Sequence, residues 1–174
     1  MQEVFIPQER ARLLASKGAM LRKLEKLCKC SIRVGAGSLV ELDGGSYDEY
    51  VARNIVYAFG RGFDLARAQK LADESTYFAS MDIGSHASKK RTMNVRSRLI
   101  GEDGRAKRYI EAVSGAFMSV YGDTVCFIGK AEEIDEAETA ARTIIEGGSH
   151  RLAYSRMEAA HRKHRHMVNE GMGP

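Results

Sequence analysis

Hydrophobic and polar positions along the chain form one pattern that occurs twice. Leu24 in the first copy corresponds to Ile110 in the second, and the same offset continues without an insertion from residues 14–62 to residues 100–148. Few residues are identical between the copies, but their apolar positions coincide. The pattern indicates duplication of one small fold.

Each copy is predicted to contain a strand, two helices, two strands and a closing helix. Apolar residues at helical spacing predict the helices, and short β-prone runs predict the strands. In the first copy, the pattern predicts a strand at 4–6, a helix at 18–28, strands at 31–34 and 39–42, and a helix at 47–59. Their counterparts in the second copy lie at 77–83, 104–114, 117–121, 124–128 and 132–146. A further helix precedes 18–28 and 104–114 in the respective copies.

Two local signals refine this prediction. Gly122-Asp123 lies between the last two strands of the second copy, where it predicts a tight hairpin turn. In the helix at 18–28, helical spacing places Leu21, Leu24, Leu27 and Cys28 on one face. Extra helices are expected at 63–73 and 149–166. The predicted fold class is therefore α+β, with domains at 1–73 and 74–174.

A glycine-bearing loop separates the two helices of the second copy. It reads Gly101-Glu102-Asp103-Gly104 and follows a helix, so it fits neither a P-loop nor a dinucleotide-binding turn. Two glycines let phosphates approach backbone N–H groups closely, and the next helix directs its N-terminus to the same place. A helix–GxxG–helix within this order of elements is typical of a type I KH domain, which clamps about four nucleotides of RNA.

The distribution of charge agrees with binding to a nucleic acid. The chain has 27 Lys and Arg against 23 Asp and Glu, a net charge of +4. Bases outnumber acids around the loop, and acids dominate the helix at 132–146. The bases are Lys89, Lys90, Arg91, Arg96, Arg98, Arg105, Lys107 and Arg108. A basic patch beside a phosphate-clamping loop is the electrostatic signature of RNA binding, although Glu102 and Asp103 must point to solvent.

The first copy departs from this loop pattern, because Ala15 stands where the first glycine would be. Close clamping of a phosphate is therefore not expected there. Two interpretations stay open for this copy, a structural or protein-binding role and an auxiliary contact with RNA. The auxiliary residues would be Lys17, Gly18, Arg22 and Lys23.

The second copy resembles a known protein family. The segments 81–84 and 99–111, the hairpin at 115–125 and the stretch 146–150 are similar to archaeal two-KH ribosome-assembly factors. These factors are relatives of the eukaryotic pre-ribosomal KH protein called the partner of Nob. The resemblance extends over essentially the whole chain and is most specific from about residue 77 to 153.

The resemblance implies a function, partners and site residues. It implies binding to the 3′ end region of small-subunit ribosomal RNA, contact with the alpha subunit of translation initiation factor two, and cooperation with a PIN-domain endonuclease. Carried over to this sequence, the RNA loop is Gly101, Glu102, Asp103 and Gly104, followed by Arg105, Lys107 and Arg108. The groove for unstacked bases is assigned to Arg98, Ile100, Met118 and Val120.

Other candidate chemistry is weak. Cys28, Cys30 and Cys126 lack zinc-site spacing and are expected to be free thiols. His161 and His164 could hold a metal, but no further ligand completes a site, and a basic terminal helix is the simpler interpretation. Neither Ser85-His86 with Asp82 nor the acids at 132–136 has the surroundings of a catalytic site. No cofactor, metal or enzymatic activity is expected.

The leading hypothesis is therefore a cytoplasmic, non-enzymatic protein that binds single-stranded RNA in ribosome assembly and pre-rRNA processing. No apolar run approaches a membrane-spanning length, and the N-terminus has no signal-peptide pattern. The alternative is a protein adaptor in translation initiation or ribosome assembly, with incidental RNA affinity. The degenerate first loop and the acidic closing helix favour that alternative.

Overall fold

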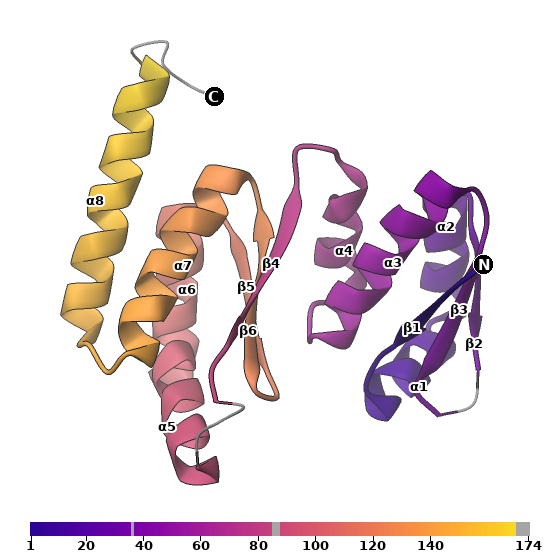
Figure 1. The fold of residues 1–174 in the computed structure, drawn as a ribbon, viewed down its shortest axis with the longest axis horizontal. Helices are drawn as coiled ribbons and strands as arrows, with labels where there is room; N and C mark the ends of the chain where they lie inside the picture. The colour runs from indigo at the N-terminus through magenta and orange to yellow at the C-terminus, as the bar shows by residue number, and fades with distance from the viewer. Residues whose placement is uncertain (36, 85–87, 170–174) are drawn as a thin grey trace. The chain divides into compact units, whose positions relative to one another are not determined.

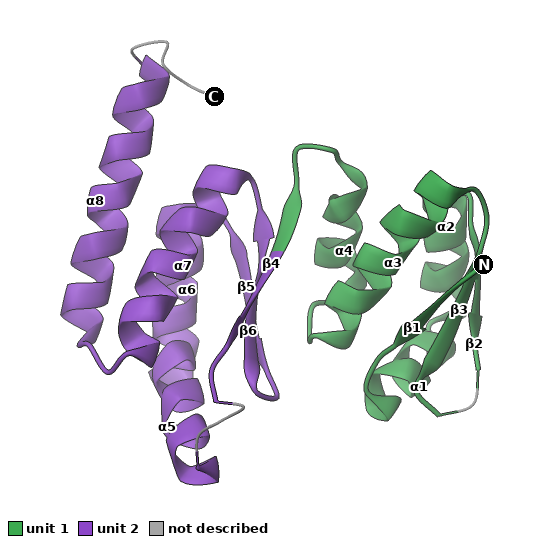
Figure 2. Ribbon diagram, in the orientation of Figure 1, with its two compact units in different colours: residues 1–78 green, residues 79–174 purple. Residues whose placement is uncertain are grey.

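The computed structural model describes residues 1–35, 37–84 and 88–169 and divides the chain into two compact units, Met1–Phe78 and Ala79–Pro174. Figure 2 shows the two units in different colours. Both combine helices with one small sheet, so the fold class is α+β. The division falls inside a strand, a few residues beyond the boundary at 73/74 predicted from the sequence.

The first unit follows the predicted order of elements (Figure 1). It contains β1 (Gln2–Phe5), α1 (Gln8–Ser16), α2 (Gly18–Cys28), β2 (Ser31–Val34), β3 (Leu39–Asp43) and α3 (Ser46–Gly60). The sheet is antiparallel with the order β1-β3-β2, and Val40 of β3 pairs with Val4 on one side and Val34 on the other. The closing helix α3 packs against β1 and β3.

The second unit repeats this order. It contains β4 (Tyr77–Asp82), which begins at the end of the first unit, then α5 (Lys89–Ile100), η2 (Glu102–Gly104), α6 (Arg105–Ser114), β5 (Phe117–Tyr121), β6 (Thr124–Gly129), α7 (Ala131–Ile145) and α8 (His150–Asn169). The sheet order β4-β6-β5 is equivalent to that of the first unit. Gly122 has a φ of 57° at the turn between β5 and β6, which confirms the predicted hairpin.

One hydrophobic core holds the second unit together. Leu99, Ile110, Phe127 and Ile144 are fully buried in it, and Met157 joins them from α8. Helix α8 packs against α7 and α6, as Figure 1 shows for the long C-terminal helix. The extra helix is therefore an integral part of this unit, because its apolar face completes the core.

On the apolar face of α2, Leu24 and Cys28 are buried, whereas Leu27 at its edge is 48% exposed. One local prediction needs correction. The helix predicted at 63–73 is broken into α4 (Leu65–Ala68) and the 3₁₀ turn η1 (Gln69–Ala72). Its start is displaced because the Asp64 side chain accepts a hydrogen bond from the backbone N–H of Arg67 at 2.8 Å and so acts as the N-cap.

The cysteines behave as predicted, since Cys28, Cys30 and Cys126 are buried and none of the three is in a disulfide. Within the part of the chain that the structure describes, no helix is long and apolar enough to cross a membrane.

Candidate nucleic-acid interface

The loop between α5 and α6 has a backbone that only glycine accommodates well. Helix α5 ends at Ile100, Gly101 has a φ of 74°, and Gly104, just before α6, has a φ of 75°. Asp103 between them also has a positive φ of 50°, a conformation that Asp tolerates better than most residues. Three of the four loop residues therefore have a positive φ, and the chain is kinked between the two helices.

The two glycines are required for different reasons. A Cβ on Gly101 would stand 2.7 Å from both the backbone nitrogen and the Cβ of Ala106, so close packing of the loop on α6 excludes a side chain. At Gly104 a Cβ would meet only the Arg108 Nη1, at 3.1 Å. Gly104 is therefore required mainly by its left-handed backbone and by the open approach that it leaves to the start of α6.

The N-terminus of α6 is open to an anion. Gly104 is its N-cap and offers no side chain to accept hydrogen bonds from the first turn, and that turn contains no acidic residue. The backbone N–H of Arg105 already donates to the carbonyl oxygen of Glu102. The positive end of the helix dipole, left without a side-chain cap, favours a phosphate at this position.

Basic side chains surround this helix start. Arg105 and Arg108 are exposed, and Lys107 is half-buried. The Arg108 guanidinium lies over Gly104, as the 3.1 Å approach shows. Glu102 and Asp103 are exposed on the loop itself, where solvent screens their charge. The loop, the N-terminus of α6 and these three bases thus form one surface, which we call the loop surface.

The predicted base-binding groove is only partly brought together. Ile100 and Val120 are half-buried, so each keeps some accessible surface. Met118 is fully buried in the core, where no base could reach it. Met118 and Val120 are two residues apart and lie on the same face of β5, so strand alternation could not tell which of them is fully buried.

Arg98 has a structural role instead of the predicted role in the groove. Its guanidinium donates hydrogen bonds to the carbonyl oxygens of Ile144, at 3.1 Å, and Gly148. The carbonyl oxygen of Arg98 is 2.8 Å from the Nε2 of His150. Arg98 therefore fastens α5 to the end of α7 and the start of α8, and we leave Arg98 and Met118 out of the loop surface.

The first unit has no comparable loop. Helix α1 extends to Ser16, so Ala15 and Ser16 are helical, and Lys17 alone separates α1 from α2. Gly18 is the first residue of α2, has no positive φ, and no heavy atom would lie within 4 Å of a Cβ there. The auxiliary residues Lys17, Gly18, Arg22 and Lys23 are all exposed. They do not lie beside a glycine loop like that at residues 101–104.

The histidines of α8 bind a buried carboxylate. His161 Nδ1 lies 2.8 Å from Glu136 Oε2, and His164 Nδ1 lies 2.9 Å from Glu136 Oε1. Among residues 1–35, 37–84 and 88–169, no cluster of His, Cys, Asp and Glu has the arrangement of a metal site. Ser85 and His86 lie outside the described residues.

Sequence reasoning missed the contacts that place α8 beside α6. The hydroxyl of Tyr109 donates a hydrogen bond to Glu158, and its ring lies 4.4 Å, between centroids, from that of Tyr154. No local pattern could have indicated this pair, because the residues belong to helices separated by a hairpin and α7. The contact holds α8 against α6.

Comparison with known proteins agrees with this architecture. Residues 77–162 match the family described as eukaryotic type KH-domain (KH-domain type I), in its PNO1 second-domain form. The chain is 32% identical to KH domain-containing protein MJ0443 of Methanocaldococcus jannaschii, over 91% of this chain and 73% of that protein.

Solved structures show the same likeness. Dim2p from Pyrococcus horikoshii is 33% identical with a TM-score of 0.79, covering 91% of this chain and 98% of that chain. A chain of the a/eIF2alpha–aDim2p–rRNA complex from the same organism is 33% identical with a TM-score of 0.83, covering 93% and 94%. The protein APE0754 from Aeropyrum pernix is 23% identical with a TM-score of 0.90, covering 98% and 95%, and shows the shared fold alone. The chain therefore belongs to the family of archaeal KH-domain proteins that includes MJ0443 and Dim2p.

Proposed function

We propose that this protein binds single-stranded RNA through the loop surface of its second unit and acts in ribosome assembly without catalysing a reaction. The observation that supports this most directly is the open N-terminus of α6, which the Gly101–Gly104 loop leaves without a side-chain cap and which Arg105, Lys107 and Arg108 surround. Family membership agrees, and so does the complex of a relative with rRNA.

We further propose that both units are KH domains and that only the second retains the RNA loop. The two units share the order of elements and the order of strands in the sheet. The first unit replaces the loop by a single residue, Lys17, between two helices. An RNA segment of about four nucleotides would then occupy the second unit alone.

In this mechanism the protein holds and positions RNA. Backbone N–H groups at the start of α6 would donate hydrogen bonds to phosphate oxygens, and the three bases would add charge-assisted contacts. The accessible parts of Ile100 and Val120 would contact unstacked bases. The segment that we propose is the 3′ region of small-subunit rRNA, delivered to a PIN-domain endonuclease for cutting. The alpha subunit of initiation factor two is a proposed partner, since a relative forms a complex with a/eIF2alpha and rRNA.

A matched pair of glycine substitutions tests the proposal. Gly104→Asp adds a side chain and a negative charge at the start of α6, and Gly18→Asp makes the same change at the start of α2, where nothing lies within 4 Å. Fluorescence anisotropy with a labelled RNA of the small-subunit 3′ end, beside a scrambled RNA, measures affinity. We expect Gly104→Asp to abolish binding and Gly18→Asp to preserve it. Unchanged affinity in a folded Gly104→Asp variant would refute the role of the loop.

The left-handed backbone at residue 104 could make that variant unstable, so a second variant is needed. Replacement of Arg105 and Arg108 by Gln removes two exposed charges without changing the backbone. If this variant folds and binds both RNAs as tightly as the original chain, the loop surface is not the RNA site.

The adaptor alternative rests on the first unit, which exposes Lys17, Arg22 and Lys23 without a phosphate cradle. A pull-down with the alpha subunit of initiation factor two distinguishes the two functions. Association that survives ribonuclease and the Gly104→Asp substitution would favour the adaptor, whereas association lost with the RNA would favour RNA binding.

A further inference from the structure

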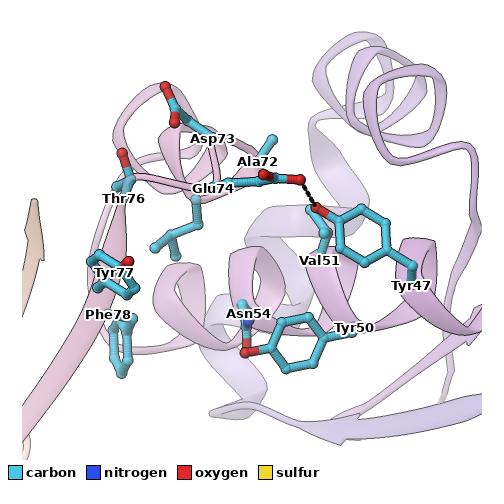
Figure 3. Close-up of a pocket in the computed structure, with 11 residues that line it drawn as sticks. Tyr47, Tyr50, Val51, Asn54, Ala72, Asp73, Glu74, Thr76, Tyr77 and Phe78 are labelled. Atoms are coloured by element: carbon cyan, nitrogen blue, oxygen red, sulfur yellow. Dashed lines mark hydrogen bonds between the residues drawn. The ribbon is translucent and has the colours of Figure 1, made fainter. Parts of the chain in front are cut away.

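A cavity of about 360 Å³ lies within the first unit. It opens between α3 and the segment that runs from Leu71 in η1 to Phe78 (Figure 3). Four of its residues come from one face of α3, namely Tyr47, Tyr50, Val51 and Asn54, at the spacing of successive helical turns.

Exposed aromatic rings line this cavity. Tyr47 is 60% exposed, Tyr50 is 56% exposed and Tyr77 is 54% exposed. Its floor is apolar, because Val51 and Leu71 belong to the buried core of the unit. Three large rings left in water around an apolar floor are unusual for a surface that contacts only solvent, since their burial would release ordered water.

The rim of the cavity is negatively charged. The Tyr47 hydroxyl donates a hydrogen bond to Glu74 Oε1 at 3.3 Å, as the dashed line in Figure 3 shows. Asp73 lies beside Glu74 and accepts hydrogen bonds from the N–H and hydroxyl of Ser75 at 2.8 and 2.7 Å. Lys70 lines an adjoining hollow, and no Lys or Arg lines this one. Within the described part of the chain, Glu74 makes no ion pair with a basic side chain.

The same negative field raises the pKa of Tyr47. The charge of Glu74 raises the pKa of Tyr47 more than any other cause, followed by burial of the hydroxyl, the hydrogen bond to Glu74 and the charge of Asp48. A field that disfavours a phenolate also disfavours a phosphate at this position, and it favours a cation.

We propose that this cavity, which we call the tyrosine pocket, binds an arginine or lysine side chain of a basic peptide segment from a partner protein. The rings of Tyr47 and Tyr50 offer faces to a cation, and Glu74 offers a carboxylate for a charge-assisted hydrogen bond. The apolar floor suits the methylene stem that joins such a cation to its backbone. Nucleic acid fits less well, because Asp73 and Glu74 repel the phosphates that adjoin any stacked base.

This inference is independent of the RNA function proposed above. The loop surface and the tyrosine pocket belong to different units and have opposite charge. The first unit would therefore recruit a protein by its basic segment, and the second would recruit RNA by its phosphates.

The test is isothermal titration calorimetry of the full chain with a short capped peptide of alternating arginine and glycine. A second peptide with citrulline in place of arginine keeps the shape and removes the charge. The variants are Glu74→Gln and Tyr50→Ala, both at exposed positions. Glu3→Gln, which removes one exposed acid from β1 of the same unit, is the matched control for net charge.

We expect the arginine peptide to bind the original chain and Glu3→Gln equally. Its affinity should fall about tenfold in Glu74→Gln and in Tyr50→Ala, and the citrulline peptide should be weaker by about the same factor. The Gly104→Asp variant should retain peptide binding, so failure of the RNA proposal would leave this result unchanged.

Three outcomes would overturn the proposal. The first is that the arginine peptide does not bind the original chain, or binds Glu74→Gln and Tyr50→Ala as tightly. The second is equal affinity for the citrulline peptide. The third is loss of single-stranded RNA affinity in Tyr50→Ala with no loss of peptide affinity, which would assign the pocket to a nucleobase. Circular dichroism melting of each variant identifies a loss of fold, and Glu74→Gln still decides the question if Tyr50→Ala unfolds.

Discussion

Gly101 at the end of α5 packs against Ala106 in the first turn of α6 so closely that no side chain fits between them. The 2.7 Å approach of a Cβ to the Ala106 backbone nitrogen combines with a φ of 74° at the same residue. Gly101 therefore stabilises the turn by its lack of a side chain, while Gly104 leaves the start of α6 accessible.

Gly101→Ala should destabilise the second unit by about 1–3 kcal/mol, because the new methyl group is both crowded and strained in the left-handed region. Urea unfolding followed by circular dichroism measures this loss. The matched control is Gly18→Ala at the start of α2, where the Cβ meets nothing and the change should be within about 0.5 kcal/mol of zero. Equal stability of both variants would contradict the packing argument.

Arg105→Gln and Arg108→Gln together should weaken RNA binding to matched and scrambled sequences alike. Contacts with phosphate contribute affinity without sequence preference. Log affinity falls linearly with log salt concentration, and each phosphate contact that is lost makes this negative slope shallower by about 1. Anisotropy titrations at several salt concentrations measure that slope. The corresponding control, Arg22→Gln with Lys23→Gln in α2, should leave the slope unaltered; a matching decrease there would mean that the first unit also contacts RNA.

Met118→Ala should lower stability by about 2–5 kcal/mol, since Met118 is fully buried opposite Phe127 and truncation leaves a cavity. RNA affinity of the folded variant should stay the same. Val120→Ala, at a half-buried position of the same strand, should have a smaller effect on stability. Thermal melting and anisotropy on the same samples separate the two effects. A stable Met118→Ala variant with weak RNA binding would restore Met118 to the groove.

Substitutions of Glu136, His161 and His164 should have coupled effects on the free energy of unfolding. Glu136 is only 2% exposed, so removing both histidines leaves a buried carboxylate without its partners. His161→Ala with His164→Ala should therefore cost about 1–3 kcal/mol of stability, and adding Glu136→Ala should recover part of that loss. Denaturant unfolding of the double and triple variants gives the comparison. A triple variant less stable than the double variant would show that the carboxylate is tolerated alone.

Cys28 should react slowly with alkylating reagents in the folded protein. Burial, followed by the charges of Cys30 and Asp48, raises the pKa of Cys28 from 9.0 to about 11. The folded state therefore holds the thiol proton more tightly than the unfolded state does. The resulting contribution of Cys28 to the free energy of unfolding is fully present below pH 9.0 and is lost as the pH rises through about 11. Iodoacetamide labelling with mass spectrometry should show Cys28 protected at pH 8 and labelled in urea. Rapid native labelling would contradict the burial of this thiol.

Several features of this protein follow from short stretches of sequence. The duplicated order of elements rests on apolar spacing within each helix and strand, and the hairpin rests on Gly122-Asp123. The glycine loop follows from residues 101–104, because positive φ angles are local requirements of the backbone. That the three cysteines form no disulfide was also predictable from their spacing.

Other features depend on partners that are distant along the chain. Met118 and Val120 have the same local pattern, and only packing against α6 and β6 decides that Met118 is the buried one. The sequence predicts Arg98 as a groove residue, but its guanidinium donates hydrogen bonds to the carbonyl groups of Ile144 and Gly148. Neither distinction can be made from periodicity, since burial is decided by which elements meet.

Local sequence is enough to predict the repeated order of elements, the glycine loop and the basic residues beside it, because each depends on neighbours a few positions away. The tertiary structure alone decided which of those residues are accessible, how α8 completes the second core, and that Tyr47, Tyr50 and Tyr77 gather around one acidic cavity. These depend on contacts between elements far apart in the chain, where hydrophobic burial and side-chain packing outweigh local preference.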